Sequence, residues 1–216
     1  MVKKHKHFSE QHRAFRHGPL IIFLGLLLLG ATFVSTTTGE QAAGTVVISV
    51  QATASLKFAL NTVDFGIGFV NTTGGNQVCV LDTEGTNSNT RCINFTTVTQ
   101  GFVLENDGNI NLTVDLLSNK NASVFIGGNS TLSAFRWKVS QNETGSCGNI
   151  TFASSYVDVN TTSPGTRICN TFSGGIGGFN SRDTNDSLRI DLNITIPYDA
   201  LAGTRNATIT ATGTAA

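Results

Sequence analysis

Apolar and polar residues alternate over long stretches of this chain, a pattern typical of β-strands that place one face on a core. The clearest stretch is residues 101–117. Its second half has apolar residues at every second position, namely Ile110, Leu112, Val114 and Leu116. Phe102 and Leu104 keep the same phase, and Asp107-Gly108 between the halves is typical of a tight reversal. We therefore predict a β-hairpin whose apolar phase is buried and whose polar phase faces water.

The same alternation recurs at both ends of the remaining chain. Residues 188–196 and 207–211 alternate strictly, with a reversal between them at 197–203. Residues 46–60 keep one apolar phase for longer than an ordinary strand, which predicts two strand segments joined by a bend. Shorter strands are predicted around residues 64–68, 78–81, 92–98, 124–126, 135–139, 150–152, 156–159 and 167–169.

About ten short strands separated by turn residues, with no competing helical window, predict an all-β fold. The architecture expected from this pattern is an antiparallel immunoglobulin-like β-sandwich. Trp137 is the largest single candidate for its core.

The N-terminal part differs in character. Residues 1–18 hold five basic residues, one acidic residue and all four His, and residues 20–29 are apolar apart from Gly25. This order predicts a signal peptide or signal-anchor helix over residues 1–34, a linker at 35–43 and the β-sandwich domain at 44–216. The apolar run is shorter than the roughly 20 residues that span a bilayer as a helix. Gln41-Ala42-Ala43 is the nearest approach to a cleavage site, so cleavage and retention as an anchor both stay open.

The rest of the chain holds nine basic and thirteen acidic residues and no His. A mildly acidic surface argues against nucleic acid, which requires clustered Lys and Arg. Low charge combined with many apolar residues argues against disorder. Membrane contact is therefore expected only through the N-terminal segment, with an extracellular or cell-surface location.

Four Cys remain, and an even number in an exported chain predicts disulfides. Three pairings are possible, and proximity in the sequence favours Cys79–Cys92 and Cys147–Cys169. A zinc site is disfavoured, because the chain has neither closely paired Cys nor His ligands in this region.

Asn-x-Ser/Thr sequons are unusually frequent. They begin at Asn71, Asn94, Asn111, Asn121, Asn129, Asn142, Asn149, Asn160, Asn185, Asn193 and Asn206. We predict a densely glycosylated surface, with an unmodified outer face rich in Asn and Thr as the alternative.

Candidate catalytic residues are lacking. Without His after residue 17, a Ser-His-Asp or Cys-His arrangement is excluded from the exported part, and no pair of carboxylates is marked for glycoside hydrolysis. Oxygen-rich loops offer two candidate calcium sites, comprising Asp82, Glu84, Asn87 and Asn89 in one and Asp183, Asn185 and Asp186 in the other. Neither has the spacing of a known calcium loop, so solvated turns are favoured. We predict no catalytic residue, no cofactor and no metal.

Two segments carry a resemblance to known proteins. Residues 103–116, VLENDGNINLTVDL, resemble the V-x-N-x-G-N-x-x-x-T-V hairpin of exported archaeal and bacterial immunoglobulin-like domains, TasA/camelysin-like fibre subunits among them. Residues 188–213 resemble the closing I-P-x-x-x-x-A-G-T strand pair of such domains. The resemblance implies a fold and a location but no active site.

These patterns together predict a non-enzymatic, glycosylated structural protein of an envelope, filament or adhesive layer. The alternatives are a carbohydrate-binding or adhesin module, a secreted hydrolase and a pilin-like subunit. The expected partner is a second copy of this chain or another envelope protein. A second copy could bind because residues 45–53 could leave their own sandwich and add to a neighbour's sheet. The alternative is that these residues form the first strand of their own domain.

Overall fold

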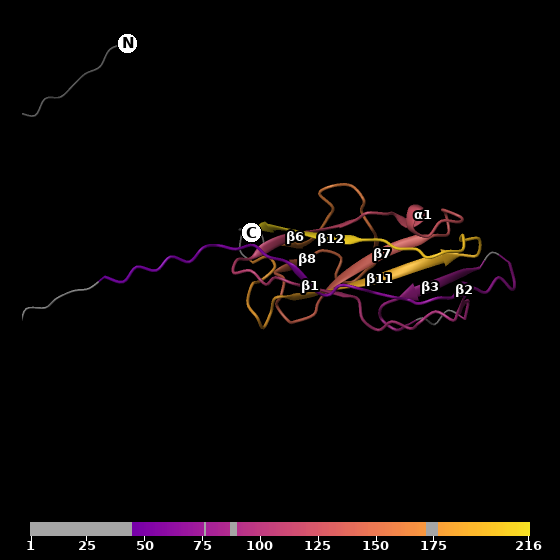
Figure 1. Ribbon diagram of the computed structural model, residues 1–216, viewed down its shortest axis with the longest axis horizontal. Helices are drawn as coiled ribbons and strands as arrows, with labels where there is room; N and C mark the ends of the chain where they lie inside the picture. Colours follow the sequence, from indigo (N-terminus) through magenta and orange to yellow (C-terminus); the bar gives the residue numbers. More distant parts are fainter. Residues whose placement is uncertain (1–44, 76, 87–89, 172–176) are drawn as a thin grey trace, which may run out of the picture. The chain divides into compact units, whose positions relative to one another are not determined.

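The computed structural model describes residues 45–75, 77–86, 90–171 and 177–216, in which antiparallel sheets make up nearly all regular structure (Figure 1). Ile48–Ala216 form one compact unit, and residues 45–47 are grouped with the preceding part of the chain. The signal or anchor segment expected at 1–34 and the linker at 35–43 lie outside the described residues. No helix within the described ranges is long and apolar enough to cross a membrane.

Two sheets build the domain. The first, here the β11 sheet, has the order β1 (Lys57–Leu60), β5 (Phe102–Glu105), β11 (Ser187–Pro197), β7 (Ala134–Gln141) and β9 (Val157–Asp158), and β3 (Val78–Asp82) also pairs with β11. The second, the β6 sheet, has the order β12 (Ile209–Ala215), β6 (Leu112–Ser118), β10 (Thr166–Asn170) and β8 (Asn149–Ile150). A small ribbon pairs β2 (Phe69–Val70) with β4 (Cys92–Ile93), and α1 (Ala122–Phe125) is a single helical turn.

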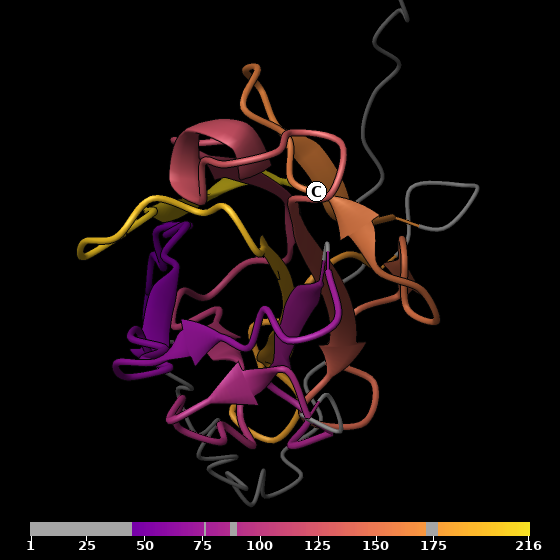
Figure 2. The ribbon, with the colours of Figure 1, turned by 90° about the vertical axis from the view of Figure 1, so that its right-hand side faces the viewer.

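Both sheets contribute to one hydrophobic core, and Figure 2 shows the strands of the domain end-on. The inward phase of β6, beginning at Leu112 and including Val114 at its centre, is fully buried, as are Leu188 and Ile190 of β11. Trp137 of β7 is also fully buried, which confirms its predicted place in the core. The prediction of an all-β chain with antiparallel sheets is therefore confirmed.

The hairpin predicted over residues 101–117 is wrong. β5 belongs to the β11 sheet and β6 to the β6 sheet, so the connection crosses from one sheet to the other. The buried side chain of Asn106 holds this crossing, because its Nδ2 donates to the carbonyl oxygens of Ile110 (2.9 Å) and Phe179 (3.0 Å). The alternating pattern is the same in both arrangements, since either one places Leu104 and Leu112 on the core.

The polar phase of β6 does not face water as predicted. Thr113 and Asp115 are only 8% and 6% exposed, because β6 lies between β12 and β10 in its sheet. The Asp115 carboxylate is neutralised by Arg167, whose Nε and Nη2 lie 2.7 and 2.9 Å from its two oxygens. This two-point hydrogen bond with Asp115 raises the pKa of Arg167.

Several predicted boundaries also need correction. Of the long phase at residues 46–60 only Lys57–Leu60 forms a strand. The strand expected at 64–68 is wrong, since β2 begins at Phe69, just after that range. Residues 124–126 belong to helix α1 and its end, because Asn121 caps that turn by accepting from the Val124 N–H. β11 and β12 lie in different sheets, so the closing segments are not a pair. The strands at 78–81, 135–139, 167–169 and 188–196 are confirmed.

Two disulfides, Cys79–Cys92 and Cys147–Cys169, join the chain as predicted. They close loops with sequence separations of 13 and 22 residues. In the chain-entropy picture each stabilises the fold by about 3 kcal/mol. The second places Cys147 and Cys169 in the core, next to the inward face of β6.

Replacing Cys147 and Cys169 together by Ala is expected to cost about 3 kcal/mol of unfolding free energy, because the unfolded chain regains the freedom of that loop. Urea unfolding monitored by tryptophan fluorescence measures the loss. A reductant should destabilise the unaltered protein further than this variant, which keeps only the Cys79–Cys92 bond. A variant as stable as the parent would contradict the assignment of this disulfide as a structural one.

Candidate functional site

The most unusual part of the described surface is residues 45–55, here called the N-terminal segment. Residues 45–55 form no strand, and from residue 48 the chain approaches the two sheets from outside them (Figure 1). The apolar residues of this segment are exposed by 94% at Val46, 82% at Val47, 86% at Ile48 and 80% at Val50. Scattered exposed aliphatic residues are normal, but a run of four within five residues is a candidate interaction site.

Backbone contacts fix the place where this segment joins the domain. Thr53 N donates to the Asn109 side-chain oxygen (2.6 Å), and Asn109 N donates back to the Thr53 carbonyl (3.0 Å). The Asn109 side-chain nitrogen also donates to the Gln51 carbonyl (2.7 Å). The crossing loop between β5 and β6 therefore holds residues 51–53 in a defined position.

Gly108 is required for this attachment. A Cβ at this position would lie 2.3 Å from the Thr53 carbonyl oxygen, so any other residue would push the segment away. The sequence suggested a tight reversal at Asp107-Gly108, and the structure instead uses the glycine for close backbone approach. Sequence reasoning missed the role of Asn109, although a DGN triplet next to a long apolar phase could have suggested it.

The eleven sequon asparagines all fall within the described ranges, and none is buried. In four of them the side-chain oxygen accepts a hydrogen bond from a residue of the same sequon, at Asn71, Asn121, Asn129 and Asn160. In two others the nitrogen that would carry a glycan is a donor, from Asn111 to the Gly177 carbonyl (3.3 Å) and from Asn142 to Ser187 Oγ (3.0 Å). Modification at those two positions would replace a hydrogen bond of the fold.

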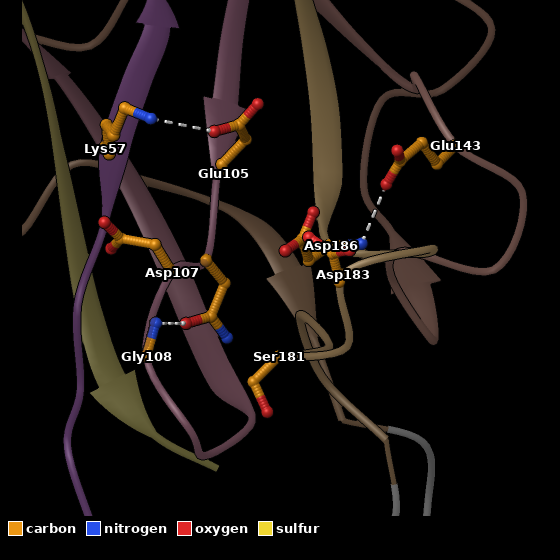
Figure 3. A pocket seen from close by; sticks show the side chains of 9 residues that line it. Lys57, Glu105, Asp107, Gly108, Glu143, Ser181, Asp183 and Asp186 are labelled. Atoms are coloured by element: carbon orange, nitrogen blue, oxygen red, sulfur yellow. Dashed lines mark hydrogen bonds and ion pairs between the residues drawn. The ribbon is translucent and has the colours of Figure 1, made fainter.

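An acidic cleft of about 500 Å³ lies beside the same crossing loop (Figure 3). Its lining residues are Lys57, Glu105, Asn106, Asp107, Gly108, Glu143, Ser181, Asp183 and Asp186. Lys57 Nζ lies 3.4 Å from Glu105 Oε2, and the Asp186 backbone N–H donates to Glu143 Oε2 at 3.0 Å. Two of the predicted calcium candidates, Asp183 and Asp186, meet here. Nowhere in the described ranges do three His, Cys, Asp or Glu residues come together as metal ligands would.

The cleft raises the pKa of Asp186. Burial is the largest cause, followed by the negative charges of Glu143, Glu105 and Asp183. The folded protein therefore binds a proton at Asp186 more tightly than the unfolded chain does. This carboxyl favours the fold most at a pH below its ordinary value of 3.8, and that contribution is lost as the pH rises through the raised pKa.

Replacing Asp186 by Asn is expected to raise the melting temperature at neutral pH by about 1–2 °C, because it removes one repelling charge. Below the ordinary pKa of 3.8 the variant and the parent should melt together, since the carboxyl is then neutral. Asp183→Asn removes a smaller cause of the raised pKa of Asp186, so it should raise the melting temperature by less. Scanning calorimetry across this pH range makes the comparison, and a lower melting temperature for Asp186→Asn at neutral pH would contradict it.

The other calcium candidates take part in ordinary loop contacts. Asp82 Oδ1 accepts from the N–H groups of Glu84 (2.9 Å) and Thr86 (3.0 Å). Glu84 binds Lys138 Nζ at 2.6 Å and Tyr156 Oη at 2.8 Å, and these two bonds lower its pKa. Burial, and then the Glu84 carboxylate, raise the pKa of Tyr156. Asn87 and Asn89 lie outside the described residues.

A comparison with the models of known protein families, and one with characterised proteins, find no match for this chain. The function is therefore argued from the site itself.

Proposed function

We propose that this chain is an exported, non-enzymatic structural subunit of a cell envelope or extracellular filament. Its domain would be an immunoglobulin-like β-sandwich, and its N-terminal segment would link it to a neighbouring copy by adding a strand to that copy's sheet. The observation that carries this proposal is the exposure of Val46, Ile48 and Val50, which would share one side of a strand if the segment paired with a sheet.

The energetics favour such a role. Burying one Val or Ile side chain is worth about 1.5–3 kcal/mol, and these three side chains are left almost entirely in water by the single chain. An added strand buries them and also pairs their backbone groups. A segment that leaves one subunit and enters the next makes a heterologous contact, and such contacts build open filaments.

The covalent chemistry of the chain fits an exposed location. Two disulfides suggest an oxidising, extracellular or surface environment. Eleven sequons on a chain with few charges would supply the hydration that its surface otherwise lacks. Glycans would keep assembled subunits soluble along their sides.

The carbohydrate-binding alternative is less favoured, because sugar-stacking platforms use exposed Trp and Tyr rings, whereas the exposed aromatic side chains of the described residues are Phe69 and Phe152. Trp137 is fully buried, and the Tyr156 hydroxyl is bound to Glu84 while Lys138 Nζ lies 4.9 Å from its ring centroid. These two rings therefore serve the fold.

Imaging tests the proposal. Cells that express the chain with a label should carry it in regular surface layers or filaments visible by electron cryotomography, and mass spectrometry of the same material should find glycans on several sequons. A labelled chain that is intracellular, or that stays monomeric and dispersed outside the cell at every concentration, would rule the proposal out.

A further inference from the structure

Strand addition requires an open sheet edge, and the described strands differ sharply in this respect. β8 and β9 are two residues long, and β1 carries Lys57 together with a break in register between Phe58 and Leu60. β3 is joined to β4 by the Cys79–Cys92 disulfide. β12 has seven residues in unbroken register with β6, and its sequence ITATGTA has no charge and no proline. It lacks the features that protect natural edges.

The pairing of β12 with β6 shows which backbone N–H and C=O groups of β12 could bond to an added strand. Leu112 exchanges hydrogen bonds with Phe179, and Ser118 N donates to the Asn160 carbonyl, so the even-numbered residues of β6 point their backbone groups away from β12. The odd-numbered residues of β6 therefore bond to Thr210, Thr212 and Thr214. The N–H and C=O groups of the alternate residues, Ile209, Ala211, Gly213 and Ala215, point to the open edge.

The side chains along the β12 edge suit the addition of a strand that has apolar residues on one side. Ile209, Ala211 and Gly213 are half-buried on the core side, whereas the threonines between them are exposed. Leu56, just before β1, packs over Gly213: a Cβ there would lie 3.1 Å from Leu56 Cδ1. A strand added to β12 would thus place one row of side chains beside the existing core.

The N-terminal segment and the start of β12 lie at opposite ends of the domain, and this arrangement gives the direction in which a strand from a second copy would be added. The N-terminal segment joins at Asn109, at the end where Ala216 N donates to the Asn111 carbonyl and β12 finishes. β12 begins at the opposite end, after the connection that holds Leu201, and α1 follows β6 there. Leu201 and Val124 of that end are 69% and 60% exposed, so a subunit stacked on it would cover further apolar surface.

We propose that the open edge of β12 accepts residues 45–50 of a second copy of this chain as an antiparallel strand. The inference rests on the proposed function and names the acceptor. With subunits stacked head to tail, Val50 would lie opposite Ile209, Ile48 opposite Ala211 and Val46 opposite Gly213. Only two residues separate Val50 from Thr53, a reach of about 10 Å, so the ends of the two domains would touch.

Disulfide trapping between different molecules tests this register. In the proposed pairing Ser49 faces Thr210 and Val47 faces Thr212, on the exposed side and in positions where opposed Cα atoms lie about 4.5 Å apart. One full-length chain carries Ser49→Cys, a second carries Thr210→Cys, and the two are mixed, allowed to assemble and oxidised. The four native Cys are already paired, so the introduced Cys supply the free thiols of the mixture.

The expected result is a covalent dimer in the mixture, formed at least about tenfold faster than with two matched controls. Thr214→Cys lies four residues further along the same edge, and Asp158→Cys lies on the β9 edge. Assembly seen by sedimentation without this preference would overturn the β12 acceptor and leave the proposed function standing. No assembly at all would overturn both. A Ser49→Cys/Thr210→Cys double variant that cross-links only within single chains would show self-pairing and overturn the second copy as donor.

Discussion

Replacing both Ile48 and Val50 by Asp is expected to raise the concentration needed for assembly by at least about 100-fold. Burial of the two side chains is worth about 3–6 kcal/mol, and 2.7 kcal/mol already corresponds to a 100-fold change in affinity. The stability of the single domain should change by less than about 0.5 kcal/mol, because both residues are exposed in it. Sedimentation velocity and electron microscopy measure the assembly, and thermal unfolding measures the domain.

The matched control places the same two charges on the opposite side of the segment. Ser49→Asp with Gln51→Asp keeps the apolar side intact and should shift assembly by less than about tenfold, by charge repulsion alone. An equal loss in the two variants would show that net charge governs assembly. Full assembly by Ile48→Asp/Val50→Asp would remove the N-terminal segment from the mechanism.

The sequence predicts much of the fold, because period-two alternation records which side of a strand meets the core. The pattern alone places Leu112 and Val114 on the core, and both are fully buried. The disulfides were also predictable, since nearby Cys on turn-rich loops have little choice of partner. These features depend on local sequence.

Features set by the position of a strand in its sheet could not be predicted in this way. Alternation is identical for a hairpin and for a crossing between sheets, so the separation of β5 from β6 depends on the contacts that Asn106 makes to Phe179, 73 residues away. Thr113 and Asp115 look like water-facing residues, yet neighbouring strands and Arg167 cover them. A polar residue opposite a core face therefore does not by itself show how far the outer face of its strand is covered.

The candidate site likewise combines features that the local sequence predicts with features that depend on the arrangement of the strands. The sequence marks residues 46–60 as one long apolar phase, but cannot separate the part that pairs with β5 from the part left in water. The structure makes that division at Lys57, because Asn109 binds Thr53 and so holds the segment before Lys57 outside the sheets. The acceptor edge was not predictable either, since nothing in ITATGTA reveals that β12 ends its sheet.

Replacing Val114 by Asp is expected to abolish cooperative folding, with a loss of at least about 4 kcal/mol. Val114 has no exposed surface and lies between Gly213 of β12 and Cys169 of β10, where the core offers no partner for a carboxylate. Tryptophan fluorescence of the buried Trp137 and near-ultraviolet circular dichroism measure the loss of packing.

Two further Asp variants on the same sheet separate burial from strand pairing. Thr210→Asp lies on the exposed side of β12 and should cost less than about 0.5 kcal/mol. Thr113→Asp should cost an intermediate amount, about 1–3 kcal/mol, because the threonine is 8% exposed and its hydroxyl donates to the Thr214 carbonyl at 3.3 Å. The loss of unfolding free energy should thus be largest for the variant at Val114, smaller at Thr113 and smallest at Thr210. This order follows from two sheets around one core, with β6 inside its sheet. A fully tolerated Thr113→Asp would instead mean that the outer face of β6 is open to water.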